Sequence, residues 1–352
     1  MLNRRHLLYA LASAPLLASA AGRLAPKPGT LLAAWEQGGD YFAGDALHPE
    51  RGIRLPARGH GLLVDRRRPG TAIVMARRPG DWLLRIDWQR GRLLQQMDAS
   101  LDRYFFGHGC FSADGHSLFT SECDVATSQG VIARRDPRTL KVLAEFPSGG
   151  IGPHEILMLA DGSLLVANGG IATLPETGRR KLNLDTMQPS LVRLDAGSGK
   201  VLAEYTLDDS KLSIRHLAQS ADGTVGVALQ DESGPTPAKP LLALLRDGQL
   251  QLAPTSPALA VRMAGYAASV AALGDCFAIS CPKGGVVAIW RSTGEWVGQY
   301  ELAGAAGLVA VDGHWQASSE AGVLARLAPA ATLMEQHVAR GIRWDNHLVW
   351  AD

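Results

Sequence analysis

Five histidines recur at equivalent positions along the sequence, each at the start of a run of residues that predicts a β-strand. Neutral imidazole is a preferred ligand of iron, copper, zinc and nickel. If the fold brings these side chains to one place, the sequence predicts a transition-metal site. The five are His60 (ARGHG), His108 (FGHGC), His154 (GPHEI), His216 (IRHLA) and His347 (DNHLV).

Polar residues near these histidines extend the candidate site. Glu122 or Glu155 would complete a metal's coordination or orient an imidazole through a hydrogen bond. Arg215 precedes His216, and a cation there favours a carboxylate, a phosphate or another anionic ligand at the same place. The other residues expected to line the site are Asn168, Gln230, Tyr266, Lys181 and Asn183.

A repeated pair of strands joined at an Asp-led turn predicts the fold that positions these residues. Three clear copies are WLLRIDWQRGRLLQQM (82–97), GVIARRDPRTLKVLAEF (130–146) and SLVRLDAGSGKVLAEY (190–205). Each copy follows another predicted hairpin, so two hairpins make a four-stranded antiparallel unit. The units recur at roughly 45 to 60 residues, which is typical of propeller blades.

Six such units run from His60 to His337, and both ends of the chain supply a seventh. DNHLVWA at the C-terminus provides its inner strand, and TLLAAWE (30–36) with the segment to Arg54-Leu55 provides the others. This arrangement closes the ring and leaves no free sheet edge. The sequence therefore predicts an all-β protein, a seven-bladed β-propeller with a split closing blade, as one domain over residues 28–352. No helix is predicted within that domain.

The histidines also have a purely structural interpretation. WD-type propellers place a Gly-His pair at the same point of a blade to brace it by hydrogen bonds, and His60 and His108 follow glycine in this way. The contexts Pro-His-Glu, Arg-His-Leu and Asn-His-Leu do not match that brace. Both interpretations stay open for each single histidine, and we favour a functional role for the set.

The N-terminal segment predicts export. Arg4-Arg5 precedes an apolar stretch and then Ala18-Ser19-Ala20, a small-x-small cleavage pattern, so residues 1–20 are expected to be an export signal of the twin-arginine type. A Sec signal or a retained anchor stays open. After removal of the signal we expect a periplasmic monomer with no membrane span. The 35 Lys and Arg residues nearly cancel the 34 Asp and Glu residues, so no broad field exists to bind nucleic acid.

The four cysteines fit no metal or haem motif. Cys110 and Cys123, and Cys276 and Cys281, are spaced unlike zinc or redox sites, and Cys-x-x-Cys-His is absent from the sequence. Cys110 and Cys123 lie on the two arms of one predicted hairpin. A disulfide between them and buried free thiols both stay open.

Several of these segments resemble one known family. GHGCFSADG, GIGPHEILMLADGSLLVANGGI, GRRKLNLDTMQPSLVRLD, SIRHLAQSADG and WDNHL are similar to the uncharacterised bacterial DUF1513 family. The resemblance implies an exported, propeller-like protein encoded near imelysin-like and iron-uptake proteins, which favours iron or copper as the metal and those proteins as partners. The sequence departs from the family pattern at Cys123, where asparagine is usual, and at Cys281.

Three classes of function remain open from the sequence. The first is a periplasmic accessory protein that binds a transition metal, iron, copper or zinc, or a metal-associated ligand, and assists metal uptake. The second is a metal-dependent hydrolase similar to propeller lactonases. The third is a ligand-free scaffold for protein interaction. The sequence lacks the Gly-x-Ser-x-Gly elbow and dinucleotide-binding motifs, which disfavours those chemistries.

Overall fold

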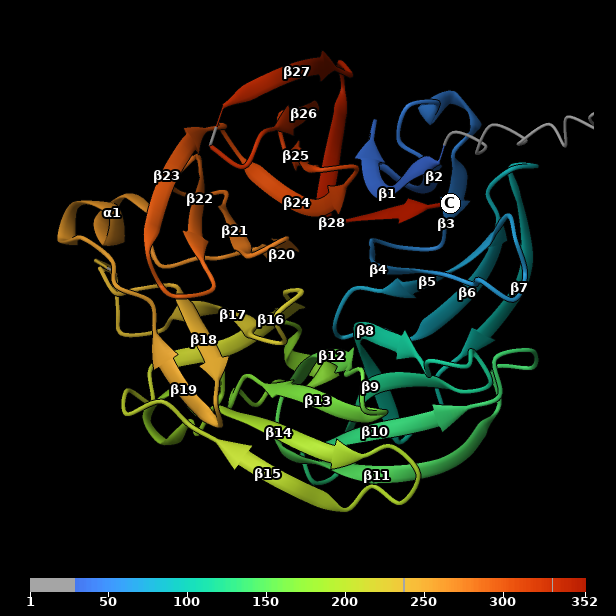
Figure 1. Ribbon diagram of the computed structural model, residues 1–352. Helices are drawn as coiled ribbons and strands as arrows, with labels where there is room; N and C mark the ends of the chain where they lie inside the picture. The colour runs from blue at the N-terminus through green and yellow to red at the C-terminus, as the bar shows by residue number, and fades with distance from the viewer. Residues whose placement is uncertain (1–28, 237, 331) are drawn as a thin grey trace, which may run out of the picture.

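The computed structural model describes residues 29–236, 238–330 and 332–352. Over these residues the chain forms seven four-stranded sheets arranged around one axis, which confirms the predicted seven-bladed β-propeller (Figure 1). The expected export signal, residues 1–20, lies outside the described residues.

Six blades follow the chain in order, each starting with its innermost strand. The first contains β4 (Gly59–Val64), β5 (Thr71–Ala76), β6 (Trp82–Asp87) and β7 (Arg92–Asp98). The second contains β8 (Arg103–Phe111), β9 (Leu118–Asp124), β10 (Gln129–Arg135) and β11 (Val142–Ile151). The third contains β12 (Pro153–Met158), β13 (Ser163–Asn168), β14 (Ser190–Asp195) and β15 (Val201–Tyr205).

The next three blades repeat the pattern. The fourth contains β16 (Leu212–Gln219), β17 (Val225–Asp231), β18 (Leu242–Arg246) and β19 (Gln249–Leu252). The fifth contains β20 (Ser269–Leu273), β21 (Cys276–Cys281), β22 (Val286–Arg291) and β23 (Trp296–Glu301). The sixth contains β24 (Ala305–Val311), β25 (His314–Ser319), β26 (Val323–Leu327) and β27 (Leu333–Val338).

The seventh blade joins the two ends of the chain, as predicted. Its strands are β28 (Ile342–Ala351), β1 (Thr30–Gln37), β2 (Asp40–Asp45) and β3 (Ile53–Leu55). β28 pairs antiparallel with β1 from Thr30↔Ala351 to Gln37↔Ile342. Each inner strand then contacts the inner strand of the next blade around the whole ring, in the order β28, β4, β8, β12, β16, β20, β24 and back to β28.

The core lies between neighbouring blades. The three inner strands of a blade are mostly buried, whereas outer strands such as β7 and β27 are mostly exposed. The closing blade is packed by Trp35 and Trp344, whose rings meet edge to face at a centroid distance of 5.5 Å. An aromatic pair of this geometry contributes about 0.5–1.5 kcal/mol beyond its buried area.

The Asp-led turns explain why the repeat is readable in the sequence. In three blades an aspartate at the end of the third strand, or directly after it, accepts a hydrogen bond from a backbone N–H three residues later, which stabilises a tight turn. The pairs are Asp87 with Arg90, Asp136 with Thr139 and Asp195 with Ser198, at 2.8–2.9 Å.

One short α-helix departs from the prediction. Helix α1 (Pro257–Arg262) begins after Ser256, whose side chain accepts a hydrogen bond from the Leu259 N–H, and Pro257 occupies its first position. Six residues are too few to show helical periodicity in the sequence. The 3-10 turns are η1 (Pro49–Arg51), η2 (Pro175–Thr177) and η3 (Leu184–Thr186). No helix in the described part of the chain is long and apolar enough to cross a membrane.

Candidate metal centre

The five histidine side chains meet at the axis of the propeller. They come from the inner strands β4, β8, β12, β16 and β28, which belong to five consecutive blades. Taken in the order of the chain, each imidazole ring lies close to the next, and the last ring lies close to the first. The distances between ring centroids are His60–His108 4.8 Å, His108–His154 4.4 Å, His154–His216 4.7 Å, His216–His347 4.9 Å and His347–His60 4.5 Å.

The ring nitrogens of these histidines lie close enough to form two candidate ligand groups. One group contains His60, His108 and His154, and the other contains His108, His216 and His347. Within each group the ligand atoms all lie within 4.8 Å of one another. Because His108 belongs to both groups, it is the central residue of the cluster.

Two carboxylates fix the orientation of two of the imidazoles. His60 Nδ1 lies 2.8 Å from Asp345 Oδ1, and His216 Nδ1 lies 3.0 Å from Glu155 Oε2. An ionised carboxylate only accepts hydrogen bonds, so Nδ1 carries the proton in both rings. These contacts use Nδ1, so Nε2 is the nitrogen that each ring leaves for a metal ion.

Three further nitrogens of the cluster are buried and have no hydrogen-bond partner. They are His108 Nε2, His154 Nδ1 and His347 Nε2. A buried polar atom without a partner costs about 1–3 kcal/mol, and native proteins seldom leave such atoms without a role. All three side chains belong to the candidate ligand groups, so a group that binds imidazole nitrogen fits there.

Breaks in the strand pairing allow the histidines to face the axis. The register of the inner strand shifts at Gly59/Leu62 in β4, at Phe105/Gly109 in β8 and at Pro153/Ile156 in β12, and each histidine lies inside the shifted segment. In β28 the segment between Trp344 and Leu348 is shifted against β1. Bulges of this kind redirect side chains next to functional sites.

Burial keeps the imidazoles of His60, His108, His154 and His347 neutral. It lowers the pKa of His60 from 6.5 to about 4, against the opposing effect of Asp345. Burial and the neighbouring imidazoles hold the pKa of His108, His154 and His347 well below the ordinary value. Neutral imidazole is the form that binds a metal ion, so these four side chains have the protonation state that coordination requires at neutral pH.

Asp345 stays ionised beside this neutral cluster. Burial alone would raise its pKa, but the hydrogen bond from His60 and the charges of Arg77 and Arg58 outweigh burial and hold the pKa well below the usual range. Arg58 Nε donates to Asp345 Oδ2 at 2.5 Å. The arginines therefore balance the carboxylate charge, and His60 does not need to be protonated to do so.

The other expected site residues divide into two groups. Glu155 contacts His216, the charge of Arg215 acts on His154 and Tyr266, and the charge of Arg77 also acts on Tyr266. Glu122, in contrast, forms a buried ion pair with Arg135 at 2.6 Å and belongs to neither candidate ligand group. Its carboxylate accepts hydrogen bonds from the Thr120 hydroxyl and from the Arg135 guanidinium.

The remaining expected lining residues act mainly as braces. Asn168 donates to the Ser148 carbonyl and accepts from the Ser148 hydroxyl. Asn183 accepts from the Ala172 N–H and donates to the Gly170 carbonyl. Lys181 pairs with Glu232, and Gln230 donates to the Ala267 carbonyl.

Sequence reasoning missed Asp345, which contacts His60, and Arg78, whose charge acts on His108 and His154. Asp345 lies two residues before His347 in the motif DNHL. This short spacing from a candidate ligand could have identified Asp345 from the sequence. Arg78 lies in a loop after β5 and gave no such signal, because its basic neighbours and Pro79 are typical of an exposed turn.

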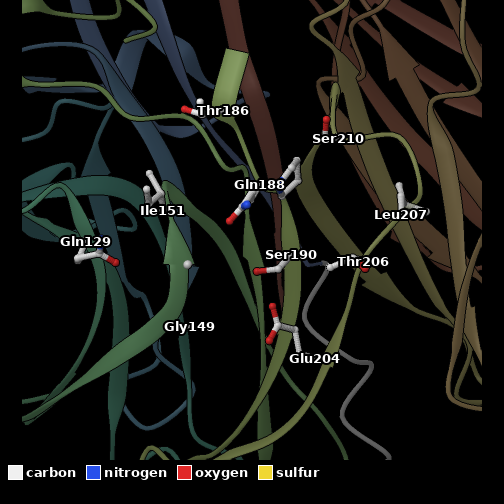
Figure 2. A pocket seen from close by; sticks show the side chains of 12 residues that line it. Gln129, Gly149, Ile151, Thr186, Gln188, Ser190, Glu204, Thr206, Leu207 and Ser210 are labelled. Carbon is white, nitrogen blue, oxygen red and sulfur yellow. The ribbon is translucent and has the colours of Figure 1, made fainter. Parts of the chain in front are cut away.

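The larger surface pockets lie away from the five-histidine cluster. Figure 2 shows a pocket of about 490 Å³ between strands β11 and β15, lined by polar side chains such as Gln129, Gln188 and Glu204 and by no histidine. A smaller cavity of about 80 Å³ reaches Arg58 and Asp345, with Glu36 and Glu320 in its wall. The second cavity therefore touches the residues that support His60.

The cysteines are all free thiols. Cys110 pairs across the hairpin with Phe119, whereas Cys123 pairs with Tyr104, so the two sulfurs lie at different levels of the β8–β9 ladder. Burial raises the pKa of Cys110 to about 12 and of Cys123 to about 11. Thiols of this kind are poor nucleophiles and poor ligands.

Comparisons with known proteins agree with this architecture. The family model described as "Protein of unknown function (DUF1513)" matches residues 53–351. Among curated proteins, none matches the chain.

Similar solved structures show the fold alone, because their sequences are distant. BamB from Moraxella catarrhalis is 14% identical over 82% of this chain and 79% of that chain, with a TM-score of 0.51. A streptogramin B lyase is 14% identical over 80% and 83%, with a TM-score of 0.56. The computationally designed Ika8 protein is 12% identical over 90% and 89%, with a TM-score of 0.53.

Proposed function

The chain belongs to the DUF1513 family of proteins of unknown function, and we propose that this member is a periplasmic propeller that binds a transition-metal ion at its histidine cluster. Iron or copper is favoured, and zinc fits the same ligands. The protein would act as an accessory to metal uptake, with imelysin-like or iron-uptake proteins as partners.

One observation carries the proposal. His108, His154 and His347 each present a buried nitrogen without a hydrogen-bond partner, and all three belong to the groups whose ligand atoms lie within 4.8 Å of one another. Histidines that only brace the blades would use these nitrogens for hydrogen bonds within the protein.

The donor set selects the class of metal. Imidazole nitrogen suits iron, copper, zinc and nickel, whereas calcium and magnesium prefer oxygen ligands. At a metal–nitrogen distance of about 2.0–2.1 Å, tetrahedral nitrogens lie about 3.4 Å apart. The present spacing of up to 4.8 Å therefore requires the rings to move together by roughly 1 Å.

Elemental analysis of the protein isolated from its native host tests the proposal. We expect stoichiometric iron, copper or zinc in the wild type and its loss in His108→Ala and in His154→Ala combined with His216→Ala. His337→Ala is the matched control, because His337 is exposed on the outer strand β27. Folding of each variant is checked by its thermal melt, and a variant that melts like the wild type but lacks metal supports the site.

Metal-free wild type from the native host would overturn the proposal and favour the scaffold. A metal-loaded protein that hydrolyses lactones or esters, with loss of activity in His108→Ala, would favour the hydrolase alternative instead. Fractionation of the native host tests the location, and export is expected to fail when Arg4 and Arg5 are both changed to lysine.

A further inference from the structure

Arg215 is a buried cation without a partner. The residue is 1% exposed, and none of its three guanidinium nitrogens has a hydrogen-bond partner. Burial is the main cause that lowers its pKa, to about 10, so the side chain remains charged at neutral pH. Burying a charge that has no partner costs several kcal/mol. A bound anion would pair with the Arg215 guanidinium and offset this cost.

The carboxylates near Arg215 and beside His60 are engaged elsewhere. Glu232 is the acidic residue whose charge acts on Arg215, but it forms an ion pair with Lys181. Asp345 already contacts Arg58 and His60. Neither carboxylate forms a hydrogen bond to Arg215 in the described part of the chain.

A second arginine faces the same neighbourhood. Arg78 is 8% exposed, and its Nη1 atom is buried without a partner. Its guanidinium lies over the Phe106 ring, 5.8 Å from the centroid, in the strand that carries His108. The charges of Arg215 and Arg78 both act on His154, and the charge of Arg215 also lowers the pKa of Arg78, so the two guanidinium groups lie near each other.

The backbone makes room for the Arg215 side chain. The register of β16 shifts between Ile214 and His216, so Arg215 is the residue that the bulge redirects. A Cβ atom on Gly169 would lie 3.0 Å from Arg215 Nη1, so the absence of a side chain at Gly169 lets the guanidinium lie there.

We propose that Arg78 and Arg215 form a buried oxyanion site beside the histidine cluster, and that it binds a carboxylate or phosphate group of a small ligand. Guanidinium groups present paired N–H donors that match the oxygens of both groups. The site is separate from the proposed metal ligands, since an anion can bind the arginines whether or not a metal is present.

The test uses metal-stripped protein, with metal content checked by elemental analysis. The thermal melt is followed in inorganic phosphate and in malonate, each compared with sodium chloride at the same ionic strength. We expect one or both oxyanions to raise Tm of the wild type in a saturable way, and the stronger of the two identifies the preferred group. Arg215→Met should abolish that shift, and Arg215→Lys, which lacks the paired donors, should weaken it.

Two comparisons separate a ligand site from a structural arginine. Without added oxyanion, Arg215→Met should melt no lower than the wild type, because the change removes a buried charge that has no partner. Gly169→Ala should weaken the oxyanion shift, whereas Arg246→Met, at an exposed position of β18, should leave it unchanged. The proposal would be overturned if chloride raised Tm as much as the oxyanions do, or if the oxyanion shift of Tm were unchanged in Arg215→Met. It would also be overturned if that variant had a clearly lower Tm than the wild type without oxyanion.

Discussion

His60 Nδ1 lies 2.8 Å from Asp345 Oδ1, although 285 residues separate the two in the chain. The contact exists because β28 closes the ring and brings the C-terminal segment beside β4. Closure of the fold and completion of the histidine cluster are therefore the same structural event. A propeller with an open seventh blade would lose His347 and the carboxylate that orients His60.

Asp345→Asn should weaken metal binding while leaving the histidines in place. The substitution removes the charge that fixes the His60 tautomer, and loss of such a supporting partner typically reduces metal affinity by about 10- to 100-fold. Competition with a chromophoric chelator measures the effect. Asp40→Asn is the control, since Asp40 pairs with Arg54 at the exposed edge of the closing blade. Equal affinities in wild type and Asp345→Asn would contradict a supporting role.

The metal-free protein should lose stability as pH falls. The pKa of His60 is about 4 in the folded state and 6.5 ordinarily, so the unfolded chain binds more protons between these values. Stability is therefore complete above pH 6.5 and decreases as pH drops toward 4, by about 3 kcal/mol from His60 alone. The other histidines with lowered pKa act in the same direction.

Urea unfolding of metal-stripped protein at about pH 7.5, 6 and 5 measures this loss. A free energy of unfolding that stays flat across the range would contradict burial of neutral imidazoles. Because the apo protein already depends on pH, a metal contribution is the difference between loaded and stripped protein at each pH. That difference should shrink where protons compete for the imidazole nitrogens.

The sequence was sufficient for the architecture because each blade repeats the same local signals. Asp136 and Asp195 mark turns whose hydrogen bonds are formed within three residues, so their effect is visible without knowing the rest of the fold. The histidines could also be identified from the sequence, because each lies on the first strand of a repeated unit.

The details of the site were less predictable because they depend on contacts between blades and on bulges. Alternation along β9 does not reveal that Glu122 faces Arg135 rather than the axis. The bulge that redirects Arg215 interrupts the period of two on which strand patterns depend. Asp345 reaches His60 only across the closure of the ring, which no local pattern describes.

Glu122→Gln should reduce stability without affecting the histidine cluster. The Glu122 carboxylate is buried against Arg135 and the Thr120 hydroxyl, and breaking a buried ion pair from one side typically costs about 3–5 kcal/mol. Urea unfolding should show this loss, and metal content per folded protein should equal that of the wild type. The double change Glu122→Met with Arg135→Met should recover part of the stability, because no charge is then left unpaired. Loss of metal in the folded Glu122→Gln protein would instead indicate that Glu122 contributes to the metal site.

The cysteines should remain unreactive until the protein unfolds. Burial raises the pKa of Cys110 to about 12 and of Cys123 to about 11, and it also raises the pKa of Cys281, which is fully buried. A colorimetric disulfide reagent at neutral pH should therefore react slowly with the native protein and should titrate all four thiols in denaturant. Fewer than four thiols in protein isolated from its native host would reveal a disulfide that the positions of Cys110 and Cys123 on β8 and β9 do not favour. Rapid reaction of one thiol in the native protein would indicate an exposed, activated cysteine and would contradict burial of these sulfurs.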